Sequence, residues 1–326
     1  IRKDVEFMKS INIGIIGVGA VGERFIKALN RHGKAEIIGI YDTNQERLVH
    51  IADTYELDTA NDYIELVESG EIDVIYLAVP PRYHHPIAMD IIQAGKDIIC
   101  EKPLANSIEE AEEMYETAEE QGIVHAMNFP VVYTPALKKI KSLLEQGFLG
   151  DLRRIELHGY FEEWPRFWQQ NSWIDTREQG GFVREVFTHF VQMTQMLFGR
   201  ITDIDTNINY PDNSEDCETG IIATGYLNDG TPMLFNGISN IGMKDELSFT
   251  MYGTDGTLSL VNWRELWKST EGEERTQVEL PEHDHLVELI DEAFKAIETG
   301  EGKVISFEDG YQAQIVIENL LGNADA

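Results

Sequence analysis

A glycine-rich turn between two apolar runs is the feature that most constrains the fold of this chain. Residues 11–16 (INIGII) predict a buried strand, and residues 17–22 (GVGAVG) follow it with three glycines in the pattern G-x-G-x-x-G. A helical period comes next, and a second apolar run, residues 35–42, ends at Asp42. A strand, a glycine turn, a helix, a strand and an acidic residue within about 30 residues predict a βαβ unit that binds a dinucleotide.

The turn and the aspartate have separate expected roles in holding that dinucleotide. Glycines allow a tight turn and let the helix N-terminus approach a pyrophosphate, so the expected contacts are Gly17, Gly19, Ala20, Val21 and Gly22. Asp42 would accept hydrogen bonds from a ribose hydroxyl, which favours NAD because the 2′-phosphate of NADP would lie against its carboxylate. Arg47 lies close behind Asp42 and leaves NADP possible. The alternative is an ordinary βαβ turn with a surface aspartate.

The alternation of strands and helices continues to about residue 130 and then stops. Apolar runs at residues 72–81 and 96–100 predict two further buried strands, and a helical pattern follows each of them. From residue 201 onward, strand-like runs follow one another closely, with hairpin-turn signals at residues 228–230 and 254–256. Helical patterns return near the end of the chain, at about residues 285–299 and 307–322.

We therefore predict an α/β chain of two domains. Residues 8–129 are expected to form a Rossmann domain with a doubly wound parallel sheet. Residues 130–326 are expected to form an α+β domain with a large, mostly antiparallel open sheet. The chain starts with Ile1, and Met8 would suit a native start, so residues 1–7 are treated as an extension.

Composition excludes several classes of partner. The 58 acidic and 26 basic residues give a net charge of −32, which would repel nucleic acid and anionic membranes. The two cysteines are too few for a disulfide framework and lack metal-ligand spacing, so we expect a cytoplasmic protein. The histidines form no metal set either, so we expect a metal-free mechanism. No apolar run reaches the roughly 18 residues of a membrane span, and none predicts a secretory signal.

A charged triplet, Glu101-Lys102-Pro103, ends the strand predicted at residues 96–100. Ligands of doubly wound sheets lie at the carboxyl ends of the strands. A lysine there can act in the proton transfer that must accompany removal of a hydride from a CH–OH group. Glu101 suits a positioning partner better than a base. The alternative for Lys102 is a solvated lysine after a strand.

A second cluster, residues 180–190 (GGFVREVFTHF), combines a glycine pair with a helical pattern. Gly180 and Gly181 would permit close approach of the backbone to a ligand. Glu185 and His189 would stand on one helix face, where the carboxylate could orient the imidazole. The alternative is a helical ion pair with a buried histidine. Arginines beside aromatic rings suit hydroxyl-rich or anionic ligands, and equally a domain interface: Trp164, Arg166, Trp168 and Arg184.

Together these motifs resemble the Gfo/Idh/MocA oxidoreductase family. The likeness rests on the glycine turn, on Pro80-x-x-x-His84, on Glu101-Lys102-Pro103 and on the stretch from Gly180-Gly181 to His189. It implies oxidation of a secondary alcohol of a sugar, cyclitol or related polyol, or reduction of the ketone, with NAD or NADP. Lys102 and His189 would exchange the hydroxyl proton, and Glu185 would orient the imidazole of His189. Further implied contacts with the cofactor come from Val79, Pro80, His84, Glu101, Lys102 and Asn128.

The chain departs from the family pattern at two positions. The family's usual residue at position 185 is aspartate, and this chain has the longer Glu185. Relatives often carry an arginine between the asparagine and the proline of the stretch 128–130, and this chain has Phe129 there. Substrate contacts from that loop are therefore not predicted.

Two rival functions remain open at this stage. Some relatives keep NAD tightly bound and use transient oxidation to cleave a glycosidic bond. A non-catalytic, nucleotide-binding regulatory subunit is the other rival, against which the intact Lys102 and His189 argue. Strands such as residues 220–227 (GIIATGYL) place apolar residues on both faces, so we expect a homodimer or homotetramer joined through the C-terminal sheet.

Overall fold

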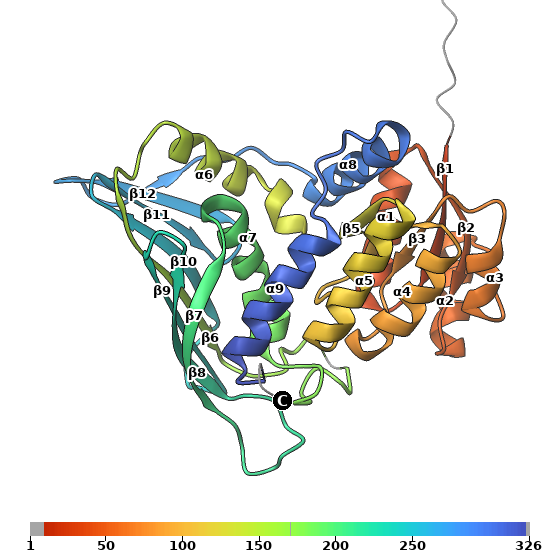
Figure 1. Cartoon of the computed structure of the whole chain (residues 1–326), viewed down its shortest axis with the longest axis horizontal. Coiled ribbons are helices and arrows are strands. Elements are labelled where there is room, and N and C mark those ends of the chain that lie inside the picture. The colour runs from red at the N-terminus through yellow and green to blue at the C-terminus, as the bar shows by residue number, and fades with distance from the viewer. Residues whose placement is uncertain (1–9, 170, 324–326) are drawn as a thin grey trace, which may run out of the picture. The chain divides into compact units, whose positions relative to one another are not determined.

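The computed structural model describes residues 10–169 and 171–323 (Figure 1). The chain divides into two compact units, each described here by itself. Unit 1 runs to Leu104 and also contains Glu112–Asn128 and Leu286–Phe307. Unit 2 contains Ala105–Ala111, Phe129–His285 and the chain from Glu308 onward. The predicted extension, residues 1–7, lies outside the described residues.

Unit 1 is built on a five-stranded sheet in the order β2-β1-β3-β4-β5, in which every neighbouring pair is parallel. Its first strand lies between the second and the third, which makes the carboxyl end of β1 the topological switch point where such sheets bind ligands. The strands are β1 (Ile11–Ile16), β2 (Ala35–Tyr41), β3 (Val74–Leu77), β4 (Asp97–Cys100) and β5 (His125–Met127). The connecting helices are α1 (Ala20–His32), α2 (Gln45–Tyr55), α3 (Tyr63–Glu68), α4 (His84–Gln93) and α5 (Ile108–Gln121), with a 3-10 turn η1 (Pro81–Tyr83). The predicted Rossmann sheet is confirmed.

Helix α8 (His285–Thr299) belongs almost entirely to unit 1, although it follows the second sheet in the chain. The His32 ring meets the edge of Phe294 at 4.9 Å between centroids, and His32 Nε2 lies 2.8 Å from Asp291 Oδ1. After the helix, Ile305 accepts a backbone hydrogen bond from Met127 of β5. The two compact units are therefore not separated by a single boundary near residue 130, because Leu286–Phe307 return to unit 1.

Unit 2 is built on an eight-stranded sheet in the order β13-β12-β11-β10-β6-β9-β8-β7. Strands β6 and β9 pair in parallel, and the other neighbours pair antiparallel. The strands are β6 (Leu152–Phe161), β7 (Ile201–Asn209), β8 (Gly220–Leu227), β9 (Pro232–Ser239), β10 (Glu246–Gly253), β11 (Gly256–Val261), β12 (Glu265–Thr270) and β13 (Thr276–Val278). The large, mostly antiparallel sheet and both hairpin turns are confirmed.

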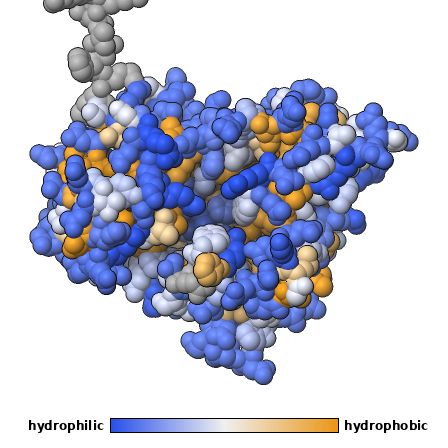
Figure 2. Space-filling model, turned by 180° about the vertical axis from the view of Figure 1, so that it is seen from behind, coloured by the Kyte–Doolittle hydropathy of each residue, from blue (hydrophilic) through white to orange (hydrophobic). Residues whose placement is uncertain are grey.

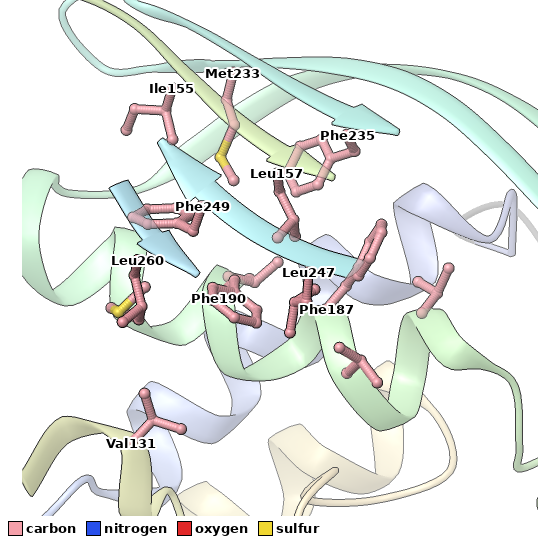
Figure 3. Close-up of a cluster of buried hydrophobic side chains, with 14 of the residues drawn as sticks. Val131, Ile155, Leu157, Phe187, Phe190, Met233, Phe235, Leu247, Phe249 and Leu260 are labelled. Carbon is pink, nitrogen blue, oxygen red and sulfur yellow. The ribbon is translucent and has the colours of Figure 1, made fainter. Parts of the chain in front are cut away.

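Helices cover one face of this sheet and bury the core of unit 2. They are α6 (Pro135–Glu145), α7 (Thr188–Phe198) and α9 (Phe307–Leu320), with a 3-10 turn η2 (Pro130–Tyr133). Phe187 and Phe190 point toward Leu157, Phe235 and Phe249 of the sheet in Figure 3. Alternate residues of each strand contribute to this core, so the other residues of the strands face away from it.

The helical pattern predicted within residues 180–190 is not α-helical throughout. Val183–Phe187 (η3) is a π-helical turn, and the α-helix α7 starts only at Thr188. A single π turn inside a helix has the same apolar pattern as an α turn at this length, so the sequence period does not reveal it.

The visible surface is mostly hydrophilic. Figure 2 shows one face on which hydrophilic side chains cover most of the area and apolar side chains form separate patches. No helix among the described residues is long and apolar enough to cross a bilayer.

Candidate functional site

The glycine turn of unit 1 leaves room for a pyrophosphate at one position and is packed at the others. A Cβ on Gly17, whose φ is +96°, would lie 2.4 Å from the carbonyl oxygen of Ala78, and one on Gly22 would lie 2.1 Å from that of Gly17. A Cβ on Gly19 would meet nothing within 4 Å. Gly19 is also the N-cap of α1 and has no side-chain cap, so the amide groups at the start of α1, at Ala20 and Val21, suit an anion. The turn fits a dinucleotide.

Asp42 lies beside the turn and holds it. Its Oδ2 accepts from the amide of Val18 at 2.8 Å, and its Oδ1 accepts from the amide of Asn44 at 2.8 Å. A carboxylate has further lone pairs on both oxygens, so it can accept ribose hydroxyls as well. Asp42 thus lies at the end of the second strand, beside the glycine turn, as the sequence predicted.

Arg47 contacts the glycine turn and a neighbouring carboxylate. Its Nε donates to the carbonyl of Val18 at 2.9 Å, and its Nη2 pairs with Glu23 Oε2 at 2.6 Å. Hydrogen bonds from Lys27 and Arg47 lower the pKa of Glu23 to about 2, so this carboxylate keeps its charge. The guanidinium therefore braces the glycine turn, and it shares the carboxylate of Glu23 with Lys27.

His84 ties together the turns that follow β3 and β4. Its ring is buried, with Nε2 2.8 Å from the carbonyl of Val79 and Nδ1 2.9 Å from the carbonyl of Pro103. Burial lowers the pKa of His84, which favours the neutral ring. His84 and the strand end at Val79 and Pro80 thus fix the backbone around Lys102, and their contacts with the cofactor stay a prediction.

A buried polar network fixes Glu101. The Tyr76 hydroxyl donates to Glu101 Oε1 at 2.5 Å, and Asn128 Nδ2 donates to the same oxygen and to the Tyr76 oxygen. Burial, with the Glu101 charge beside it, raises the pKa of Tyr76 well above its usual value, so the hydroxyl stays protonated and donates. Stacking on Phe25, with ring centroids 3.7 Å apart, holds the tyrosine in place. Glu101 is thereby a fixed carboxylate rather than a mobile base.

Asn128 contributes a second group to this end of the sheet. Within residues 10–169 and 171–323, no hydrogen-bond partner faces its Oδ1, although the side chain is buried. A buried amide oxygen without a partner is costly unless a ligand supplies a donor. The prediction that Asn128 contacts the cofactor fits this geometry.

Lys102 follows Glu101 directly at the carboxyl end of β4. Its backbone N–H lies 3.4 Å from Glu101 Oε2, and its side chain is half-buried. The Lys102–Pro103 peptide bond is cis. The structure therefore places Lys102 at the carboxyl ends of the parallel strands, where the sequence predicted it.

In unit 2, Glu185 lies on the π-helical turn and His189 on the first turn of α7. The His189 ring meets Phe129 and Trp263 edge to face, at 5.5 Å and 5.4 Å between centroids. These two aromatic rings hold the imidazole plane. The predicted pairing of Glu185 with His189 stays a prediction.

The longer side chain at position 185 reaches the aromatic loop. Glu185 Oε2 accepts from Gln169 Nε2 at 3.3 Å, and Gln169 Oε1 accepts from Arg166 Nε at 2.7 Å. The Arg166 guanidinium lies 5.3 Å from the Trp164 ring and 4.7 Å from the Trp168 ring. The buried amide of Gln169 therefore joins the loop to the helical segment, and the exposed Trp168 stays open to a ligand.

Two expectations for the 180–190 stretch need correction. Arg184 is buried and donates to both carboxylate oxygens of Glu318 and to the carbonyl of Arg177, so it forms a structural ion pair and we leave it out of the substrate contacts. The glycine pair makes room for the protein itself rather than for a ligand. A Cβ on Gly180 would lie 2.1 Å from the carbonyl oxygen of Ile174, and one on Gly181 would lie 2.1 Å from Glu218 Oε2.

Four residues of the two clusters were missed by the sequence reasoning: Tyr76, Gln169, Glu218 and Trp263. Tyr76 is a polar group within an apolar strand run, which signals a buried hydroxyl that needs a partner. Gln169 and Trp263 lie in loops without a pattern. In the described part of the chain no group of three or more histidine, cysteine or acidic side chains could hold a metal ion.

Comparison with known proteins identifies both domains of the chain. The model of the oxidoreductase family with an NAD-binding Rossmann fold matches residues 11–129, and the model of its C-terminal alpha/beta domain matches residues 141–324. The oxidoreductase YrbE of Bacillus subtilis is 25% identical, over 78% of this chain and 75% of that protein. Levoglucosan dehydrogenase of Pseudarthrobacter phenanthrenivorans is 29% identical, over 61% of this chain and 54% of that protein, so this alignment spans about half of the relative.

A solved structure extends the likeness to nearly the whole chain. A levoglucosan dehydrogenase in complex with NADH superposes with a TM-score of 0.86 at 22% identity, over 97% of each chain. At this identity the likeness shows the fold, while the two family models cover most of the sequence. This chain belongs to the Gfo/Idh/MocA oxidoreductase family, and its N-terminal part is the family's NAD-binding Rossmann domain.

Proposed function

We propose that this oxidoreductase moves a hydride between NAD and a secondary alcohol or ketone of a sugar, a cyclitol or a related polyol. The observation that carries the proposal is Lys102, which stands at the carboxyl end of β4 next to a carboxylate fixed by Tyr76 and Asn128. The relative named levoglucosan dehydrogenase, 29% identical, supports the substrate class.

Lys102 is the residue we assign to the proton of the reacting hydroxyl. Bound NAD supplies the hydride acceptor for oxidation of the alcohol carbon. As that carbon loses its hydride, the hydroxyl must lose its proton, and a neutral lysine amine can take it. Glu101 does not exchange this proton. Its fixed carboxylate, two donors on one oxygen, sets the backbone from which Lys102 extends.

His189 and the aromatic loop are the residues we assign to the substrate in unit 2. The imidazole, held edge-on by Phe129 and Trp263, can grip one hydroxyl and exchange its proton. Trp164, Arg166 and Trp168 offer flat faces and a cation, which suit a sugar ring with apolar CH groups and polar hydroxyls. Glu185 holds the loop through Gln169.

A panel of sugars, inositols and their keto forms, assayed with NAD and with NADP, tests the proposal. Stoichiometric formation of reduced nicotinamide supports it. Release of a glycosidic leaving group without net NADH would support the transient-oxidation rival. Nucleotide binding without turnover on any member of the panel would support the regulatory-subunit rival.

NAD is expected to bind more tightly than NADP, because Asp42 would lie beside the ribose and Arg47 is paired with Glu23. Asp42→Ala should narrow the difference in affinity between NAD and NADP, mainly by relieving repulsion of the 2′-phosphate. Titration of both cofactors at matched salt measures it, with Asp53→Ala, an exposed aspartate of α2, as the control. Tighter binding of NADP than of NAD by the wild-type chain would contradict the assignment.

We also propose that the chain forms a homo-oligomer through the uncovered face of the eight-stranded sheet. Ile222, Tyr226 and Ile238 of β8 and β9 lie opposite the core side and are 63%, 41% and 41% exposed. The same face carries both charges, with Arg154 paired to Glu156. A second copy suits such a face, because a two-fold interface joins one patch to itself and can match its own charges.

Ile222→Lys is expected to shift the assembly toward monomer, since a charge would have to be buried in the interface. Sedimentation at micromolar concentration measures the change. Val49→Lys, at an apolar residue of α2 that is 55% exposed, is the matched control and should leave the assembly unaltered. A wild-type chain that sediments as a monomer would rule out the interface.

The cytoplasm is the compartment we propose. Cys100 and Cys217 are both buried and unbridged, a state that a reducing compartment maintains. Fractionation of cells that express the chain, with antibody detection, tests this placement.

A further inference from the structure

A buried carboxylate holds the start of the helical segment that carries Glu185 and His189. Glu218 lies in the connection between β7 and β8, is 1% exposed, and accepts from the amide of Val183 at 2.7 Å through Oε1. The amide of Phe182 also contributes to holding this carboxylate. Amide groups in the first turn of a helix lack partners within the helix, and a negative charge is favoured there.

The backbone around Glu218 is built to deliver the carboxylate to that place. Gly181 has a φ of +94°, and a Cβ on it would collide with Glu218 Oε2. The segment before Glu218 is tied to the preceding loop, because the amide of Cys217 donates to the carbonyl of Asp175 at 2.8 Å and the amide of Arg177 donates to the carbonyl of Glu215 at 2.7 Å. The side chain therefore reaches the helix from a braced segment, not from a free loop.

We propose that Glu218 is a positioning residue, whose carboxylate fixes the first turn of this helical segment and thereby sets where Glu185 and His189 lie. The inference rests on the proposed function only for its kinetic consequence. Both side chains follow Val183 within two helical turns, so a shift of the first turn moves them. This carboxylate explains Gly181, one of the two glycines for which the sequence predicted contact with a ligand.

The environment of Glu218 makes its carboxyl group ionise near neutral pH. Burial raises the pKa of Glu218 to about 7, although the amides and the positive charge of Arg184 on the helical segment offset part of the effect. The other groups that act on this site are Tyr210 at the end of β7, with Arg177 over its ring at 3.7 Å, Cys217 of the same connection, and Glu318 of α9, which pairs with Arg184.

The direction of the pH dependence follows from this shift. The pKa of Glu218 in the folded protein lies above the usual value of 4.5 for a glutamate. Proton binding therefore stabilises the fold fully below about pH 4.5, and this contribution is lost as the pH rises through about 7. The ionised form makes the stronger, charge-assisted hydrogen bond to the helix start. Positioning of His189 should therefore improve over the pH range in which stability falls.

Glu218→Gln is the variant that separates charge from shape. The amide keeps an oxygen that can accept from Val183 but cannot ionise. We expect kcat/KM to lose its rise near pH 7 and to lie about fivefold below wild type at higher pH, with NAD binding unaltered. Glu215→Gln, at an exposed residue of the same connection, should behave as wild type.

An NMR titration of the Val183 amide makes the test independent of any substrate. In wild type its shift should follow one ionisation near pH 7, and in Glu218→Gln that transition should vanish. If Val183 titrates identically in both proteins, Glu218 does not act on the helix start and the proposal fails. If Val183 responds as expected while no sugar or polyol is turned over, the positioning role stands and the proposed substrate class fails. If Val183 responds but kcat/KM keeps its wild-type pH profile in Glu218→Gln, the contact between Glu218 and Val183 has no role in placing His189 and the proposal is overturned.

Discussion

Lys102→Met is expected to lower turnover by roughly two to four orders of magnitude, the usual contribution of general acid–base catalysis. Methionine keeps most of the length and the apolar stem of lysine but has no amine. NAD binding should stay near the wild-type value, because the glycine turn and Asp42 are expected to hold the dinucleotide. Single-turnover kinetics with a substrate from the panel measures the loss.

The control for this variant is Lys34→Met, at an exposed lysine between α1 and β2. It removes the same charge from the same unit and should keep the wild-type rate. If Lys102→Met reacts at the wild-type rate between about pH 6 and pH 10, the lysine has only a structural role, and the assignment of the charged triplet is wrong.

His189→Ala is expected to lower turnover by roughly two orders of magnitude and to raise the KM for the substrate. Both effects follow from one cause, since the imidazole would grip a hydroxyl and also exchange its proton. The space left beside Phe129 and Trp263 could loosen the ring cluster, so His189→Asn is the better-matched variant. It keeps a donor and an acceptor but cannot act as an acid or base near neutral pH.

The two variants separate gripping from proton exchange. Compared with His189→Ala, His189→Asn should bring the KM much closer to the wild-type value and raise the turnover only slightly. His50→Ala, at an exposed histidine of α2, should leave both unchanged. A His189→Asn enzyme with wild-type turnover would remove the imidazole from the proton path.

The glycine turn and the charged triplet could be predicted because each depends on a short stretch of chain. Strand β1, the turn and α1 follow one another directly, so the spacing of the glycines already contains the geometry. The two-domain fold with its two kinds of sheet followed from the change of pattern near residue 130. The resemblance to the Gfo/Idh/MocA family is confirmed by the two family models.

Partners that are distant in the sequence could not be predicted. Tyr76 and Asn128 meet Glu101 because β3, β4 and β5 are neighbours in the sheet, and only the strand order brings them together. Gly181 is required by Glu218, which follows more than 30 residues later, and Gly180 by the carbonyl group of Ile174. A glycine signals that space is needed but not what fills it.

Side-chain reach was also invisible in the sequence. Arg47 pairs with Glu23 and Arg184 with Glu318, and an arginine near a motif looks the same whether it binds a ligand or a carboxylate. Glu185 departs from the family's usual aspartate, and the structure supplies a physical reason for the extra methylene. It extends to Gln169 of the aromatic loop, a contact that the shorter residue would have to make by moving the backbone.

The measurement that tests the central claim most directly is single-turnover transfer with a substrate deuterated at the alcohol carbon. The account predicts that wild type forms one reduced nicotinamide per site, with a primary isotope effect, and that Lys102→Met slows this step while binding NAD normally. Formation of a hydrolysed or otherwise altered sugar with no net reduced nicotinamide, or an unaltered step in Lys102→Met, would contradict it.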